Sequence, residues 1–178
     1  VINSESVNIE RQLAGGGTTC NLLHGSANPI GGQNAVIKLR LGGSPEELLF
    51  NEAPAGIKFA LGENVKQSNW GDKYTTRFPQ SRMGVKTFFE NRFNAALAYQ
   101  EKTAQHKREN KPTLRNLELE AILEIINGKR LIHCHSYRQD EILVFLRTME
   151  SFGVRVASLQ HVLEGYKVAD EIAKHGAG

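Results

Sequence analysis

The sequence predicts an α/β fold built around a parallel sheet, either open or closed into a barrel. Short apolar runs rich in β-branched residues alternate with longer segments whose apolar residues recur at helical spacing, and this alternation is typical of parallel strands joined by helices. The chain has 178 residues, which is enough for one sizeable core but short for two domains. Its composition, 40% hydrophobic and 23% charged, is that of an ordinary globular protein.

The first third of the chain is predicted to hold two strands and two short helices. Residues 4–13 are weakly helical, and the three glycines at 15–17 end that pattern. Residues 18–23 and 35–41 are apolar runs on either side of a loop of turn-forming residues, so each is predicted as a strand. Ser44 followed by Pro45 is typical of a helix N-terminus.

The rest of the chain continues the alternation after one long irregular segment. Residues 65–82 are polar and contain Trp70 and Pro79, and a loop of that length in a compact domain is more often functional than accidental. We expect all the strands to lie parallel in one sheet. The remaining strands are predicted at 56–61, 131–135 and 154–159, and the helices at 85–108, 114–126, 139–152 and 165–174.

Charge and composition exclude several classes of protein. The 22 Lys and Arg residues against 19 Asp and Glu leave a net charge of +3, whereas a dedicated nucleic-acid binder should be plainly basic. No apolar run reaches the roughly 18–20 residues that a membrane-spanning helix needs. The two cysteines, Cys20 and Cys134, are too few for a disulfide framework and lack the spacing of a metal site.

Both ends of the sequence indicate an internal piece of a longer protein. The chain opens on Val1 rather than Met, and residues 174–178 read as a helix end that leads into another element. We therefore expect the parent to extend in both directions, and no cellular compartment is predicted.

Histidines follow two successive strands at the edge where parallel folds gather their functional side chains. His133 and His135 are two residues apart, so they share one face of their strand, and His161 follows the next strand. Glu63 ends an earlier strand in the same way. Imidazole and carboxylate are ligands for zinc, so these residues predict a metal site. Ordinary hydrogen-bonded histidines and a surface glutamate are the alternative.

Three stretches of the sequence resemble the metal-dependent amidohydrolase superfamily, most closely its imidazolonepropionase- and prolidase-like branch. The stretches are 13–40, 53–85 and 133–178, and they contain HGSANPIGGQ, LGENVKQ and QHVLEGYKVAD. The resemblance implies a (β/α)₈ TIM barrel that holds one or two divalent metal ions, zinc in first place. In that family the ligands are an HxH pair on the first strand, a Lys or Glu near the third or fourth, a His on each of the fifth and sixth, and an Asp on the eighth.

The resemblance assigns three metal ligands in this chain. Glu63 in LGEN corresponds to the bridging carboxylate, His135 in HSYRQDEI to the fifth-strand ligand, and His161 in QHVLEGYK to the sixth-strand ligand. His133 is then a neighbour, although residues 133–135 can also be read as the first-strand HxH itself. The residues expected to support the ligands or contact substrate are His133, His24, Tyr137 and Lys167.

The departures from the family pattern are as informative as the matches. Neither a separate HxH pair nor an eighth-strand Asp is present, and a complete barrel runs to about 250 residues. Residues 1–178 are therefore expected to be the central part of a catalytic barrel, with no general base assigned and no activity of its own. The implied parent hydrolyses a C–N bond of a small amide, cyclic amide or dipeptide-like substrate through a metal-activated water.

Two other functions stay open on the sequence. The chain can be read as a metal-free α/β module that binds a small ligand, or as an assembly module that associates with a second copy or with the rest of the parent chain. Metal binding that depends on the histidines distinguishes the hydrolase from both alternatives.

Overall fold

A four-stranded sheet forms the centre of the molecule. The computed structural model describes residues 2–66, 71, 73 and 77–178, so part of the irregular segment predicted at 65–82 lies outside the described residues. The strands are β2 (Ile30–Gln33), β4 (Gly56–Ala60), β5 (Leu131–Ser136) and β6 (Val156–His161), in the order β2-β4-β5-β6. The neighbours β4, β5 and β6 are parallel, and β2 runs antiparallel to β4. The α/β prediction is confirmed, and the described sheet is open rather than a closed barrel.

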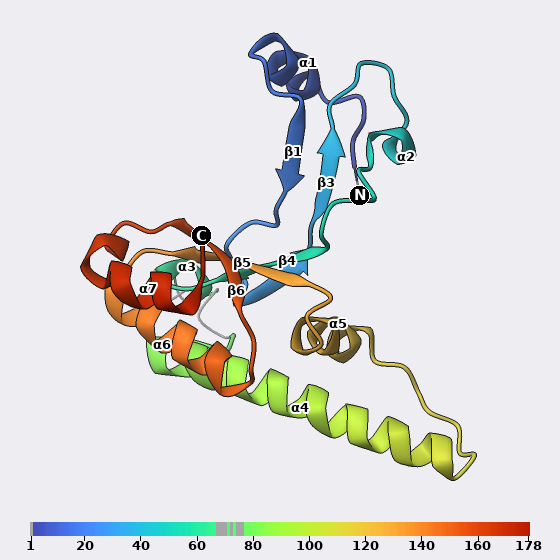
Figure 1. The fold of residues 1–178 in the computed structure, drawn as a ribbon, viewed down its shortest axis with the longest axis vertical. Coiled ribbons are helices and arrows are strands. Elements are labelled where there is room, and N and C mark those ends of the chain that lie inside the picture. Colours follow the sequence, from blue (N-terminus) through green and yellow to red (C-terminus); the bar gives the residue numbers. More distant parts are fainter. Residues whose placement is uncertain (1, 67–70, 72, 74–76) are drawn as a thin grey trace.

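The first two predicted strands do not join this sheet. They form a separate antiparallel ribbon of β1 (Thr19–Leu22) and β3 (Ala35–Lys38), which extends away from the sheet in Figure 1. The prediction that all strands lie parallel in one sheet was therefore wrong. The segment between the two strands is rich in turn-forming residues and holds no crossover helix, which parallel neighbours normally require. That segment instead contains β2, whose four residues lie in the segment predicted as a loop.

A small second core stabilises the ribbon. Two short helices, α1 (Val7–Ala14) and α2 (Pro45–Leu48), pack on it near the N-terminal end of the chain (Figure 1). The buried residues of this cluster are Ile9, Ile37, Leu39 and Leu48. The helix predicted at Ser44 is confirmed, and it begins with a capping box. The Glu47 amide donates to the Ser44 hydroxyl, and the Ser44 amide donates to the Glu47 carboxylate.

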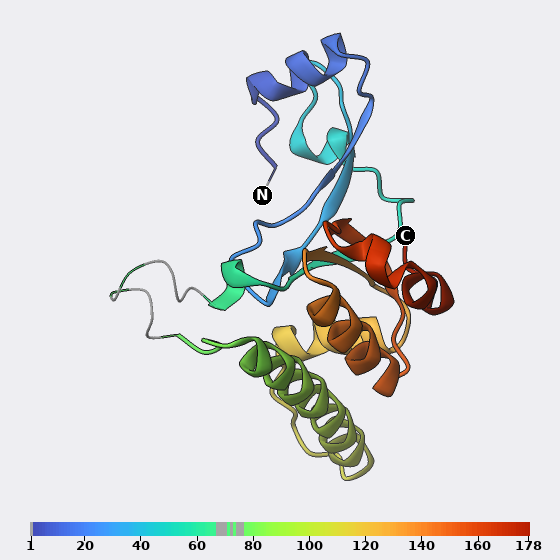
Figure 2. The ribbon, with the colours of Figure 1, turned by 90° about the vertical axis from the view of Figure 1, so that its left-hand side faces the viewer.

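The main helices follow the sequence prediction closely and lie on one side of the sheet (Figures 1 and 2). The short helix α3 (Glu63–Lys66) follows β4, and a 3₁₀ turn, η2 (Gly165–Val168), leads into α7 (Ala169–His175). The longer helices are α4 (Arg82–Arg108), α5 (Leu117–Ile126) and α6 (Gln139–Ser151). No helix among the described residues is long and apolar enough to cross a membrane.

Phenylalanines dominate the core between the sheet and the helices. Phe59 of β4 is fully buried, and its ring stacks on Phe89 of α4 with centroids 5.4 Å apart. Phe93 and Phe145 contact the same ring from α4 and α6. The apolar stripe predicted on residues 85–108 is thus confirmed as core. Because side chains alternate along a strand, the residues on either side of Phe59 in β4 point to the opposite face of the sheet.

The outer edge of β6 carries the last residue of the chain. The Gly178 amide donates to the Ala157 carbonyl at 2.9 Å, and the Leu159 amide donates to the Gly178 carbonyl at 2.8 Å. In parallel strands, the amide and the carbonyl of one residue bond to two residues of the neighbouring strand that lie two positions apart, as Gly178 does with Ala157 and Leu159. Gly178 therefore lies where a further strand parallel to β6 would run.

Candidate functional site

The predicted site residues gather at the carboxyl ends of three parallel strands. Glu63 is the first residue of α3, directly after β4, and His135 lies near the end of β5. His161 is the last residue of β6, and Lys167 belongs to the turn η2 that follows. These residues therefore lie at the edge of the sheet where the sequence predicted them.

His135 and His161 form the centre of this edge. Their rings meet edge to face, with centroids 4.7 Å apart. The Tyr137 ring contacts both, at 4.4 Å from His135 and 5.6 Å from His161. The structure thus brings together two of the three predicted metal ligands and one predicted substrate contact.

The backbone at the end of β6 brings His161 to its partner. In the register of β5 and β6, His135 lies opposite Gln160 and Ser136 lies opposite His161. Strict alternation would place the His161 side chain on the other face of the sheet from His135. The chain leaves the extended conformation at this point, with φ of 67° at His161 and 48° at Val162. We infer that this left-handed turn directs the imidazole of His161 toward His135.

Left-handed backbone at a β-branched residue is costly, and strain of this kind clusters at functional sites. Two hydrogen bonds to the end of β5 hold the turn: the Val162 amide donates to the Ser136 carbonyl at 3.0 Å, and the Glu164 amide to the Tyr137 carbonyl at 2.9 Å. Gly165 packs closely against this turn, since a Cβ at that position would clash with Cγ1 of Val162.

His135 is suited to be a metal ligand because it stays uncharged at neutral pH. It is only 2% exposed, and burial lowers its pKa to about 4, with further contributions from His161 and Lys58. Its Nδ1 has no hydrogen-bond partner among the described residues, and its Nε2 lies 3.5 Å from Nδ2 of Asn64. A buried neutral imidazole with an unpartnered nitrogen has the donor chemistry that a divalent metal requires.

Acidification is expected to destabilise the protein between pH 6.5 and about 4. In that range the unfolded chain binds a proton at residue 135 that the folded chain does not, so the free energy of unfolding falls as the pH falls. The shift corresponds to a loss of up to about 3 kcal/mol, complete below pH 4. Urea unfolding in EDTA at pH 7.5 and pH 4 measures it. A His135→Gln variant should lose less stability than the parent, and an equal loss would contradict the assignment.

A polar layer lies deeper on the same face of the sheet. Lys58 of β4 is 5% exposed and donates to Oε1 of Gln160 at 2.6 Å. His133 lies beside it, with Nδ1 2.7 Å from Oγ of Ser158. Burial lowers the pKa of Lys58, and burial together with Lys58 lowers that of His133. Lys58 and Gln160 were not predicted as site residues, although a lysine within the apolar run 56–61 indicates a buried polar contact.

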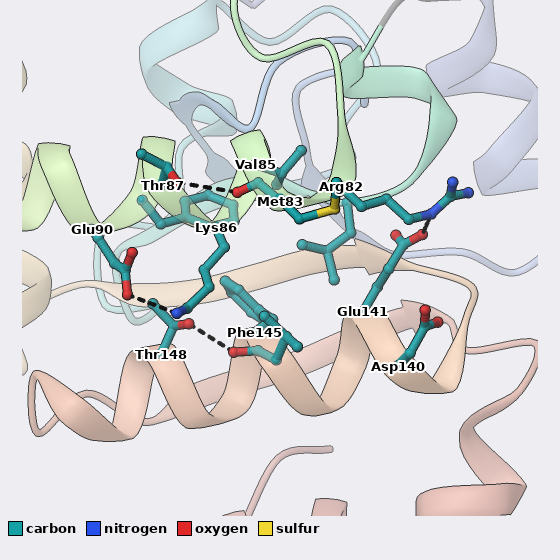
Figure 3. A pocket seen from close by; sticks show the side chains of 13 residues that line it. Arg82, Met83, Val85, Lys86, Thr87, Glu90, Asp140, Glu141, Phe145 and Thr148 are labelled. Atoms are coloured by element: carbon teal, nitrogen blue, oxygen red, sulfur yellow. Dashed lines mark hydrogen bonds and ion pairs between the residues drawn. The ribbon is translucent and has the colours of Figure 1, made fainter.

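Glu63 is ion-paired in this structure. Its Oε1 accepts hydrogen bonds from Lys66 at 2.9 Å and from Arg82 at 2.8 Å, and the Lys66 bond is the main cause that lowers the pKa of the carboxyl. Arg82 also pairs with Glu141 of α6 (Figure 3). Within the described part of the chain, no three His, Cys, Asp or Glu side chains are grouped closely enough to hold a metal ion. In this structure the Glu63 carboxylate is therefore bound to Lys66 and Arg82 rather than grouped with the two imidazoles.

The other predicted residues occupy less central positions. His24 packs against Gly31 of β2, and its Nδ1 lies 2.6 Å from the Gly25 carbonyl. Lys167 pairs with Glu164 at 2.9 Å on the exposed turn after β6. Arg82, Glu141 and Asn64 were not predicted as site residues, although Asn64 directly follows Glu63 in LGEN and Glu141 lies in HSYRQDEI with His135.

Comparison with known proteins relates the chain to an amidohydrolase. An amidohydrolase from Thermotoga maritima MSB8 has a similar structure, with a TM-score of 0.88 and 32% sequence identity. The match covers 99% of this chain and 45% of that protein, so the chain spans about half the length of its neighbour. No protein-family model matches the chain, and no curated protein was found to match it.

Proposed function

We propose that this chain supplies His135 and His161 as metal ligands to an amidohydrolase, an enzyme that hydrolyses a C–N bond. The observation that carries the proposal is the contact between these two imidazoles at the ends of neighbouring parallel strands. The strained, firmly held backbone at His161 and the neutral state of His135 support it. The similarity to the Thermotoga amidohydrolase supports the hydrolase class.

The residues of the site have distinct parts in this function. His135 and His161 would hold a divalent ion, zinc in first place, with Glu63 as the third ligand once it exchanges its ion pairs. Such an ion, when bound, lowers the pKa of a water molecule and polarises the carbonyl of an amide. Burial keeps His135 unprotonated, Tyr137 packs against both imidazoles, and the bond from Val162 to Ser136 fixes the turn that carries His161.

We propose the hydrolytic activity for the whole protein that contains this chain. The chain spans 45% of the neighbour's length, and three parallel strands with Gly178 beside β6 support a place within a (β/α)₈ barrel. We propose a small amide, cyclic amide or dipeptide-like substrate, as in the imidazolonepropionase- and prolidase-like branch. The general base and the remaining metal ligands would come from other segments of the whole protein.

The experiment compares the 178-residue chain with a longer protein that contains it. Both are assayed on N-acyl amino acids, dipeptides and cyclic amides, with zinc or manganese and with EDTA. We expect EDTA-sensitive hydrolysis by the longer protein, lost in His161→Ala, and no turnover by the chain alone. Hydrolysis that survives both EDTA and His161→Ala would overturn the proposal. EDTA-sensitive turnover by the chain alone would show that its site is complete.

A further inference from the structure

The hairpin that joins α4 to α5 ends in a basic tip, residues 102–115. The tip carries five Lys or Arg side chains and one acid, Glu109. Arg108, the last residue of α4, is exposed. Leu114 is 92% exposed, and Leu117 at the start of α5 is 69% exposed. The tip therefore combines positive charge with apolar surface that the described part of the chain does not cover.

An acidic groove of about 510 Å³ lies between the start of α1 and the segment that leads into α2. Its lining contains the carboxylates of Glu5, Glu10 and Glu47, and none of the described residues that line it is Lys or Arg. Val7 and Leu41 add apolar surface to the lining, and they are 54% and 68% exposed. The groove thus has the charge that the basic tip lacks, together with apolar side chains of its own.

The basic tip and the acidic groove lie too far apart to meet within one chain. Figures 1 and 2 show α1 and α2, which border the groove, at one end of the molecule and the far end of α4 at the other. Each chain therefore presents one projecting basic surface and one concave acidic surface to other molecules. Surfaces of opposite charge steer molecules together and fix how they dock.

We propose that the basic tip of one copy of this chain docks into the acidic groove of a second copy. Leu114 contacts Val7 and Leu41 in the groove, and the cations of the tip face Glu5 and Glu10. The contact joins two different surfaces, so each copy keeps a free tip or a free groove, and further copies add head to tail. A contact of this size is weak, and its exposed charges make it sensitive to salt.

Sedimentation equilibrium of the 178-residue chain at about 0.05 M and 0.5 M salt tests the inference. We expect the average mass to rise with protein concentration at low salt, and the dissociation constant to be about tenfold higher at high salt. A chain that stays monomeric at about 300 µM in low salt would overturn the inference. Binding of that monomer to anionic phospholipid vesicles would then assign the basic tip to a membrane surface instead.

A tip variant, Arg108→Gln/Leu114→Ser, should weaken self-association about tenfold. Its matched control is Arg147→Gln/Leu163→Ser, which makes the same two changes at exposed positions of α6 and of the turn after β6. We expect the control to associate as the parent does. Equal weakening in the tip variant and the control would overturn the inference.

A groove variant, Glu5→Gln/Glu10→Gln, distinguishes a tip-to-groove contact from any other. Alone it should be weakened as much as the tip variant, because each lacks one of the two surfaces. An equimolar mixture of the two variants should form a 1:1 dimer and no larger species, since each pair then holds one intact tip and one intact groove. A mixture that stays monomeric, or a groove variant that associates as strongly as the parent, would contradict the proposed contact.

Discussion

Replacement of His135 by alanine is expected to reduce zinc affinity about 100-fold or more, and to remove activity from the whole protein together with the metal. The structure gives the reason. His135 is buried, neutral at pH 7 and in contact with His161, so its loss leaves a single imidazole at the edge of the sheet. Zinc affinity by calorimetry and metal content per chain measure the effect.

His133→Ala is the matched control for this prediction. His133 occupies the same face of β5 but lies two residues deeper, about 6.6–6.8 Å along the strand, and its Nδ1 is engaged with Ser158. We expect that variant to keep zinc affinity within about tenfold of the parent and to lose activity only in part. Equal metal loss in the two variants would mean that residues 133–135 act as an HxH pair, and the assignment of β5 as the fifth barrel strand would be wrong.

The largest expected effect on stability comes from the centre of the core. Phe59→Ala should lower the free energy of unfolding by about 3–5 kcal/mol, because the ring is fully buried and contacts Phe89, Phe93 and Phe145. Phe78, whose side chain is more than half exposed, provides the control, and Phe78→Ala should cost about 1 kcal/mol or less. Urea unfolding measures both. A loss at Phe59 no larger than at Phe78 would contradict the described core.

Much of the fold was predictable because its signals are local. The apolar runs that became β4, β5 and β6 are bounded by turn residues, and the stripe on residues 85–108 matches the buried face of α4. The pairing of β1 with β3 was not predictable in the same way. A four-residue strand does not encode its partner, and β2 itself contains two glycines and a glutamine, a composition that predicts a loop rather than a strand.

Only the site residues that lie at the ends of predicted strands could be predicted from the sequence. His135 and His161 were placed at one edge because parallel strands end together, and the structure brings their rings into contact. The left-handed turn at residues 161 and 162 could not be predicted, because the β-branched Val162 strongly disfavours positive φ even though His tolerates it better than most residues. The ion pairs of Arg82 with Glu63 and Glu141 depend on how α3, α4 and α6 meet, which only the folded chain determines.

The X-ray absorption spectrum of the zinc-loaded chain shows which side chains bind the metal. We expect two imidazole nitrogens per zinc at about 2.0–2.1 Å. One imidazole should remain in either His135→Gln or His161→Gln, and both in His133→Gln. A spectrum that keeps two imidazoles in the His135→Gln and His161→Gln variants would contradict the claim that these two residues are the metal ligands.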